Sequence, residues 1–171
     1  MDIPFYVKLF KQAAARLDEK RFAAKQINIA TGIYQQEAVF LKLYKKSWAS
    51  PLQDPLTAES RIFFSVWVTD TAIQQQQLLY NIHALKLRKL QGYAIESRKF
   101  ADTFRNSFKP FETAWPNVSV QFGPLTLMQG SVKTDQDNFQ DKIIQLSNNF
   151  LTIEHLIDDA LIKFKKQTSF M

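Results

Sequence analysis

The segment TDQDNFQDKIIQLSNNFLTIEHLIDDALIKFKK, residues 134–166, carries the longest regular pattern in this chain. Its apolar residues recur at alternating steps of four and three, the a/d spacing of a helix with a single apolar stripe. The stripe consists of Phe139, Ile143, Leu146, Phe150, Ile153, Ile157, Ala160 and Phe164. The pattern therefore predicts a long C-terminal helix, over residues 136–166, that requires an apolar surface to pack against.

Two features of this segment bear on whether it forms one continuous helix. The stripe keeps its phase throughout, and aspartates precede it while lysines follow it, which suits the dipole of a single helix. Asn148 and Asn149, in contrast, are weak helix formers. One long helix is favoured, and a break at these asparagines that would give a kinked pair remains the alternative.

The stripe has two alternative partners. Leu151, Leu156 and Leu161 widen the apolar surface beyond a narrow seam, which favours packing inside the same domain over a two-stranded coiled coil. A similar apolar spacing from Ile3 to Ala24 predicts a long first helix, to about residue 25, beside the C-terminal one. A homodimer formed through the stripe is the second alternative.

Three stretches with the period-two alternation of β-strands follow the first predicted helix. They cover residues 27–34, 39–44 and 62–68, and a proline-containing loop over 50–55 separates the last two. Residues 62–68 carry apolar side chains on both faces. This strand is therefore expected to lie centrally in an antiparallel meander, with both of its sides covered.

The remaining elements complete an α+β pattern. Residues 72–90 predict a helix that begins after a Thr-Asp-Thr capping signature and ends before Gly92. Residues 97–115 predict another helix, with phenylalanines along one face, and 118–122 and 125–128 predict two short strands. We expect a single α+β domain over residues 1–171. In it, helices pack a small antiparallel sheet of three to five strands, and the long N- and C-terminal helices lie side by side.

The composition excludes several classes of protein. A chain of 171 residues is long enough to bury a substantial core, and the absence of Cys excludes disulfides and thiolate chemistry. The most apolar stretch, residues 62–68, is far shorter than the ~20 residues that span a bilayer. The N-terminus lacks the basic region of a secretory signal. We therefore expect a cytoplasmic protein that does not bind membranes.

The net charge is +6, and a basic cluster lies within residues 81–110. Its candidate binding residues are Lys86, Arg88, Lys89, Arg98, Arg105 and Lys109. The simplest interpretation is a solvated face with ion pairs such as Arg98–Asp102, each contributing on the order of 0.2–0.5 kcal/mol. The alternative is contact with phosphate groups, which would bind a nucleic acid or another acidic partner without reading its sequence.

No sequence motif identifies a reaction. The chain has no GxGxxG, P-loop or GxSxG motif, and with only four glycines it offers little for a phosphate cradle. Its two histidines, His83 and His155, lack the spacing of metal ligands, so no metal or cofactor is predicted. His83, which has basic neighbours, is the one candidate acid/base residue.

These patterns favour a non-enzymatic interaction or binding protein, with a homodimer as an open assembly state. One alternative is a nucleic-acid-binding protein that uses the basic 81–110 face. The other is an enzyme whose site assembles from residues remote in sequence around His83.

Overall fold

The structure, a computed structural model, describes residues 1–167. It is an α+β fold built on a five-stranded sheet in which each strand pairs antiparallel with the next. The strands are β1 (Asn28–Tyr34), β2 (Ala38–Tyr44), β3 (Arg61–Thr69), β4 (Gln77–Leu85) and β5 (Thr126–Lys133). The sheet is thus a meander, and the strand predicted over 62–68 is its central strand.

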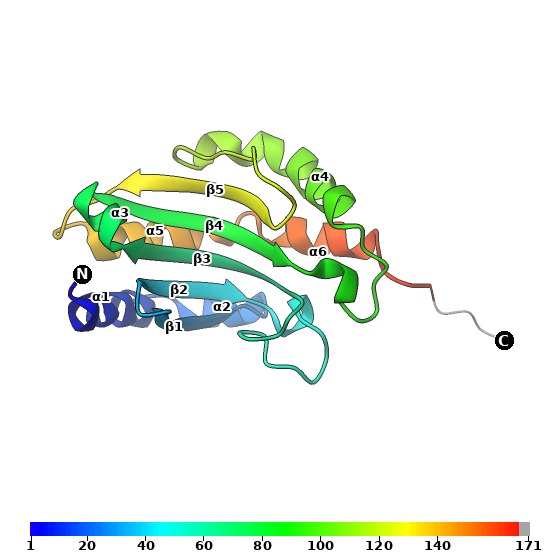
Figure 1. Cartoon of the computed structure of the whole chain (residues 1–171), viewed down its shortest axis with the longest axis horizontal. Helices are drawn as coiled ribbons and strands as arrows, with labels where there is room; N and C mark the ends of the chain where they lie inside the picture. The colour runs from blue at the N-terminus through cyan, green and yellow to red at the C-terminus, as the bar shows by residue number, and fades with distance from the viewer. Residues whose placement is uncertain (168–171) are drawn as a thin grey trace.

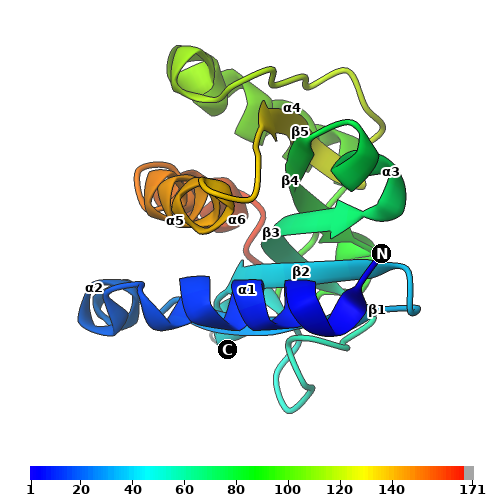
Figure 2. The ribbon, with the colours of Figure 1, turned by 90° about the vertical axis from the view of Figure 1, so that its left-hand side faces the viewer.

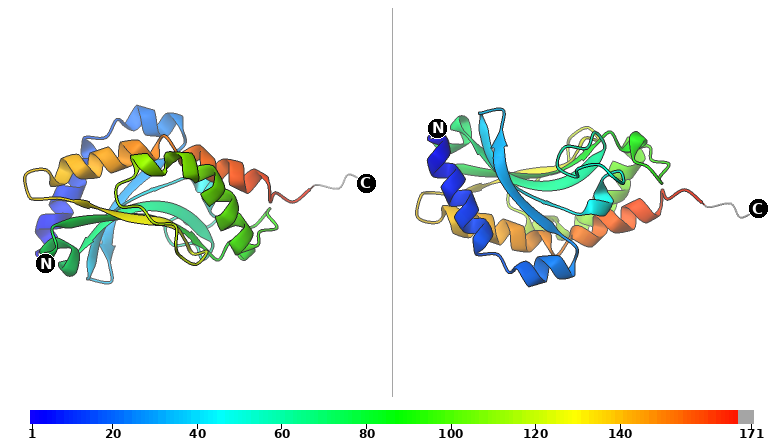
Figure 3. Two further views of the ribbon diagram at one scale, coloured as in Figure 1. Left: turned by 90° about the horizontal axis from the view of Figure 1, so that it is seen from above. Right: turned by 90° about the horizontal axis from the view of Figure 1, so that it is seen from below.

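The longer helices gather on one face of this sheet. The helices are α1 (Ile3–Ala15), α2 (Glu19–Ala24), α3 (Asp70–Gln74), α4 (Ser97–Phe108), α5 (Phe139–Phe150) and α6 (Glu154–Ile162), of which the short α3 only connects β3 to β4. In Figure 1 the strands lie in front, with α5 and α6 behind β3 and β4. Figure 2 shows α5 and α6 on one side of the strongly twisted sheet, and the two views of Figure 3 show its opposite face without a long helix.

The long C-terminal helix predicted over 136–166 is interrupted between α5 and α6. The backbone N–H groups of Leu151, Thr152 and Ile153 each donate to the carbonyl three residues earlier, the tighter 3₁₀ pattern. The break therefore lies just after Asn148-Asn149, where the alternative had placed it. The stripe itself is buried in the protein's own core from Phe139 to Ala160.

The first predicted helix, to about residue 25, is also two helices. The N–H groups of Arg16 and Leu17 bond back by three residues, and Asp18 then caps α2 by accepting from the N–H of Arg21. α1 contacts the beginning of α5, where the ring centroids of Phe10 and Phe139 lie 5.6 Å apart. The terminal helices therefore meet as expected, but each is shorter than predicted.

Residues 72–90 contain a strand instead of the predicted helix. The capping signature begins only the five-residue α3, and Gln76, with a φ of 53°, then reverses the chain into β4. β4 pairs with β3 on one side and β5 on the other. Residues 118–122 form only an isolated bridge, between Ser119 and Gln129.

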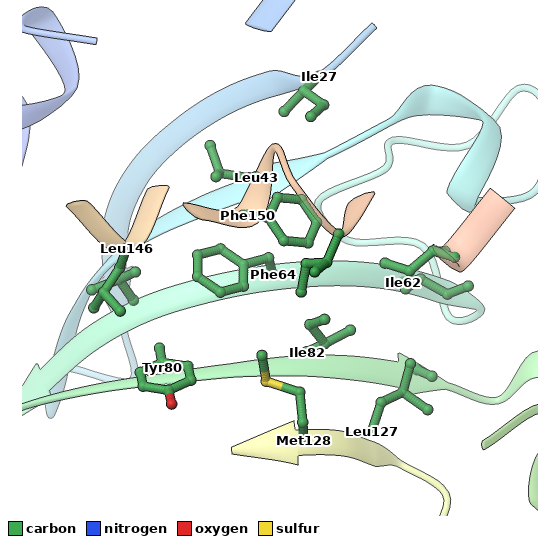
Figure 4. Close-up of a cluster of buried hydrophobic side chains, with 14 of the residues drawn as sticks. Ile27, Leu43, Ile62, Phe64, Tyr80, Ile82, Leu127, Met128, Leu146 and Phe150 are labelled. Carbon is green, nitrogen blue, oxygen red and sulfur yellow. The ribbon is translucent and has the colours of Figure 1, made fainter. Parts of the chain in front are cut away.

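The core lies between the sheet and the helices behind it. Figure 4 shows Phe64 of β3 against Phe150 of α5, and their rings stack at 4.6 Å with an interplanar angle of 15°. Ile62 and Ile82 extend this layer along β3 and β4, and both are buried. Because side chains alternate along a strand, their neighbours point to the opposite face, which no long helix of residues 1–167 covers.

Candidate functional site

The open face of the sheet contains a cavity of about 510 Å³, called the hollow below. Its walls come from β2, β3 and β4 and from the turn between β1 and β2. The side chains that line it include Tyr34, Glu37, Phe40, Lys42, Arg61, Phe63, Ser65, Trp67, Asn81 and His83. A volume of this size falls in the range of roughly 300–1,000 Å³ that is usual for small-molecule sites.

Strand register arranges these side chains in rows across the sheet. The rows are Phe40–Trp67–Leu79, Lys42–Ser65–Asn81 and Phe63–His83. Because successive residues on one face are ~6.6 Å apart along a strand, an apolar row, a polar row and an aromatic row follow one another. Near the β1–β2 turn the hollow is thus lined by the rings of Phe40 and Trp67 together with the polar side chains of Tyr34 and Glu37, whereas cations and the Phe63 ring line it toward the start of β3.

Two cations meet at the ring of Phe63. The Nζ of Lys42 lies 4.5 Å from its centroid and 4.4 Å from that of Phe40, and the guanidinium carbon of Arg61 lies 5.3 Å from the centroid of Phe63. Neither cation has a carboxylate partner among residues 1–167. Arg61 donates through Nη1 to the carbonyl of Ala58, whereas its Nε is buried without an acceptor there.

Burial and the neighbouring guanidinium disfavour the charged form of Lys42. Burial, and then the charge of Arg61, lower the pKa of Lys42 from 10.5 to about 8. Burial also lowers the pKa of the Arg61 guanidinium. An anion placed between these groups would favour the charged form of both, so the hollow is suited electrostatically to a negative ligand.

His83 also lies in the hollow, held by hydrogen bonds to Asn81 and Leu125, with the Thr126 hydroxyl 3.4 Å from its Nδ1. In the tautomer that satisfies both, Nδ1 donates to the carbonyl of Leu125 at 3.3 Å and Nε2 accepts from the Asn81 amide at 2.8 Å. The Asn81 side chain in turn accepts from the Ser65 hydroxyl at 2.7 Å. Burial lowers the pKa of His83 from 6.5, and the charges of Lys42 and Arg61 act in the same direction. Because both ring nitrogens are engaged, this geometry favours a positioning role over acid/base chemistry.

The six basic residues proposed from the sequence lie outside the hollow, on two different segments. Lys86, Arg88 and Lys89 belong to the turn after β4, and Arg98, Arg105 and Lys109 follow α4 to its end. Glu59 accepts from the ammonium groups of both Lys86 and Lys89 at 2.9 Å, which lowers the pKa of this carboxyl from 4.5 to about 2. Arg88, Arg98 and Lys109 are exposed. The proposed Arg98–Asp102 pair is not among the ion pairs of residues 1–167, whereas Lys99 pairs with Glu96 at 3.1 Å.

Arg105 is occupied by backbone carbonyls. Its Nε donates to the carbonyl of Leu127 at 3.1 Å, and its Nη2 donates to those of Phe122, Gly123 and Thr126 at 3.0, 3.0 and 2.9 Å. The guanidinium therefore ties the loop that precedes β5 to α4. These contacts favour a structural role for Arg105 over contact with phosphate.

We expect Arg105→Lys to lower the free energy of unfolding by about 1–3 kcal/mol, because one ammonium cannot replace the planar fork and leaves carbonyls unpaired. Urea denaturation measures this change. Arg98→Lys, at an exposed position of the same helix, is the matched control and should change stability by less than about 0.5 kcal/mol. Equal stability of Arg105→Lys and the unmodified protein would contradict the structural role.

Sequence reasoning missed most of this site. Of the proposed residues only His83 lies in the hollow, and Lys42, Arg61 and Trp67 were not candidates. A signal was present in β3, where the face opposite the core reads cation, aromatic, polar, aromatic from Arg61 to Trp67. That face was expected to be covered, and the structure leaves it lining the hollow.

Comparison of the chain with protein-family models, with curated proteins and with solved structures finds no match. In the part of the chain that the structure describes, no helix is both long enough and apolar enough to cross a membrane. Residues 1–167 also contain no group of three or more His, Cys, Asp or Glu side chains arranged to hold a metal ion.

Proposed function

We propose that this chain is a non-enzymatic binding protein that holds a small organic anion on the open face of its sheet. One observation carries this proposal: Lys42 and Arg61 converge on Phe63 and find no carboxylate partner within residues 1–167. Partly buried cations are costly to leave without a counter-charge. A bound anion would remove that cost and would gain charge-assisted hydrogen bonds.

The shape of the hollow supports a small molecule as the ligand. Its walls are mostly apolar, with a few polar groups placed among aromatic rings, which is the usual composition of small-molecule sites. The hydrogen bonds of His83 and Ser65 to Asn81 favour binding over catalysis, because they engage the groups that would otherwise transfer a proton or attack a substrate.

The alternatives have less support. Lys86, Lys89 and Arg105 are engaged within the chain, which weakens the basic 81–110 face as a nucleic-acid-binding surface. The C-terminal stripe, on which a homodimer was suggested, is buried from Phe139 to Ala160. Binding in the hollow requires neither a homodimer nor the cytoplasmic location expected from the sequence.

We expect Lys42→Met to weaken the binding of organic anions about tenfold at pH 7, because it removes one of the two cations and keeps the length of the side chain. Isothermal titration calorimetry measures the loss, with benzoate and octanoate as first ligands and benzamide as the uncharged comparison. Arg88→Met, which removes an exposed cation outside the hollow, should leave these affinities unchanged.

Two results would contradict the proposal. One is the absence of saturable binding for every anion tested. The other is equal affinity of an anion for Lys42→Met and for the unmodified protein, since binding would then occur elsewhere. A thermal unfolding transition at the same temperature as that of the unmodified protein would show that the variant is folded.

A further inference from the structure

The two ends of the hollow differ in chemistry. At one end Lys42 and Arg61 cover Phe63, which is only 5% exposed. At the other end Phe40 and Trp67, directly paired across β2 and β3, are half-buried and line the hollow, and the Nζ of Lys42 lies 4.4 Å from the centroid of Phe40. The backbone positions of Phe63 and Trp67 are ~13 Å apart along β3, so a ligand that touches both ends must combine an anionic group with an apolar group across a short spacer.

One edge of the Arg61 guanidinium has no acceptor within residues 1–167, and because its Nε is buried, a ligand reaches this edge only when the side chain turns toward the hollow. Its Nη1 is engaged by the carbonyl of Ala58, which leaves Nε and Nη2 as the pair of parallel donors on the other side of the guanidinium. This edge matches the two oxygens of a carboxylate. A carboxylate bound there would also supply an acceptor to the Nε, which is buried without one.

The floor of the hollow disfavours a phosphate. Phosphate sites are commonly cradled by free backbone N–H groups at helix N-termini or in nests. The floor here is β3, which is paired with β2 on one side and with β4 on the other. Recognition of the anion therefore falls to side chains, among which Lys42 and Arg61 supply the positive charge.

The rings of Phe40 and Trp67 favour an aromatic group at the other end. The end of the Phe40 ring comes close to β1 because its register partner is Gly32, where even a Cβ would meet the ring at 2.8 Å. The neighbouring Trp67 adds a second flat surface. Aromatic groups gain stacking energy against such surfaces beyond the burial of their area.

We infer that the ligand is an aromatic carboxylate, with its carboxylate between Lys42 and Arg61 and its ring against Phe40 and Trp67. This inference rests on the proposed function and specifies its ligand class. It predicts that neither a phosphate nor an aliphatic chain can replace these two groups without loss of affinity.

Titration calorimetry with four probes tests the inference: 3-phenylpropionate, 3-phenylpropanamide, phenyl phosphate and hexanoate. We expect 3-phenylpropionate to bind about tenfold more tightly than each of the others. Tighter binding of phenyl phosphate, or equal binding of hexanoate, would overturn the ligand class while the proposed function stands. Binding of none of the charged probes, or equal binding of the uncharged amide, would count against both.

Two variants locate the two groups of the ligand. Arg61→Lys keeps the charge but removes the fork, so it should weaken 3-phenylpropionate about tenfold and reduce its advantage over phenyl phosphate. Trp67→Leu should abolish the advantage of 3-phenylpropionate over hexanoate and leave hexanoate affinity nearly unchanged. The assigned orientation would be overturned if Trp67→Leu weakened the binding of 3-phenylpropionate and of hexanoate equally. It would also be overturned if Arg61→Lys bound 3-phenylpropionate as tightly as the unmodified protein. Circular dichroism checks that each variant is folded.

Discussion

Replacing Lys45 by Met is expected to lower the free energy of unfolding by about 3–5 kcal/mol. The Lys45 side chain is only 8% exposed, and its ammonium lies 2.5 Å from carboxylate oxygens of both Glu154 and Asp158. These two carboxylates follow each other on α6 at i and i+4, so without the cation they would repel each other. Glu154, which is buried, would lose its main counter-charge.

This cluster joins segments that are distant along the chain. Lys45 follows β2, Lys25 ends α2 and lies 3.5 Å from Glu154, and Trp48 donates its indole N–H to Asp158 at 2.8 Å. Burial alone would lower the pKa of Lys45, but its hydrogen bonds to Asp158 and Glu154 outweigh burial and raise it. Because the pKa is raised in the folded state, this stabilisation is fully present below the unfolded value of 10.5 and is lost only as pH rises above it.

Urea denaturation measures the effect, and Lys46→Met at the exposed neighbouring position is the matched control. The control should change stability by less than about 0.5 kcal/mol. Adding Glu154→Met to Lys45→Met should recover part of the loss, because it removes the buried carboxylate that has lost its main counter-charge. A loss below about 1 kcal/mol for Lys45→Met, or a further loss in the double variant, would show that the cluster does not hold α6.

Short-range patterns predicted the first three strands and the composition of the core. They failed at β4, because the leucines at 78, 79 and 85 and Ile82 have a spacing that also fits one face of a helix. Leu78 and Ile82 face the core, whereas Leu85 lies on the opposite face and lines the hollow. Pairing with β3 and β5 decides the outcome, and such long-range hydrogen bonds leave no periodic signal in a single segment.

The helix break after Phe150 has a similar origin. The apolar stripe continues through the 3₁₀ turn, so its phase does not reveal the interruption. Asn149, which argued for a break, donates its amide to the carbonyl of Ala114, a residue distant in sequence. Asn149 therefore contributes a tertiary contact near the break as well as a low local helix propensity.

The residues of the hollow could not be predicted from the sequence, because long-range strand pairing brings them together. Lys42 and Arg61 belong to different strands, and only the sheet register brings both to Phe63. The basic cluster, in contrast, was conspicuous because its residues are close in sequence. Glu59, which pairs with two of its lysines, is remote from it along the chain.

The affinity of the hollow for 3-phenylpropionate is expected to fall by up to about tenfold as pH rises from 7 to 9.5. The pKa of Lys42 in the free protein is about 8, so its ammonium is lost within this range, whereas the guanidinium of Arg61 keeps its charge. The lowered pKa of His83 keeps that side chain neutral throughout. Because deprotonation removes the same charge as Lys42→Met, the full effect at higher pH should approach the loss expected for that variant.

The same group should make stability change with pH in the opposite direction. Between pH 8 and 10.5 the unfolded chain holds a proton on Lys42 that the free folded protein has released, so the free energy of unfolding gains a contribution that rises with pH. Lys42→Arg should abolish both dependences and retain binding, and it controls for the other titratable groups in the hollow, Tyr34, Glu37 and His83. Calorimetric titrations with 3-phenylpropionate at pH 7 and 9.5 measure the change in affinity. Equal affinity at the two pH values, or a fall that persists in Lys42→Arg, would exclude Lys42 as the group that receives the anion.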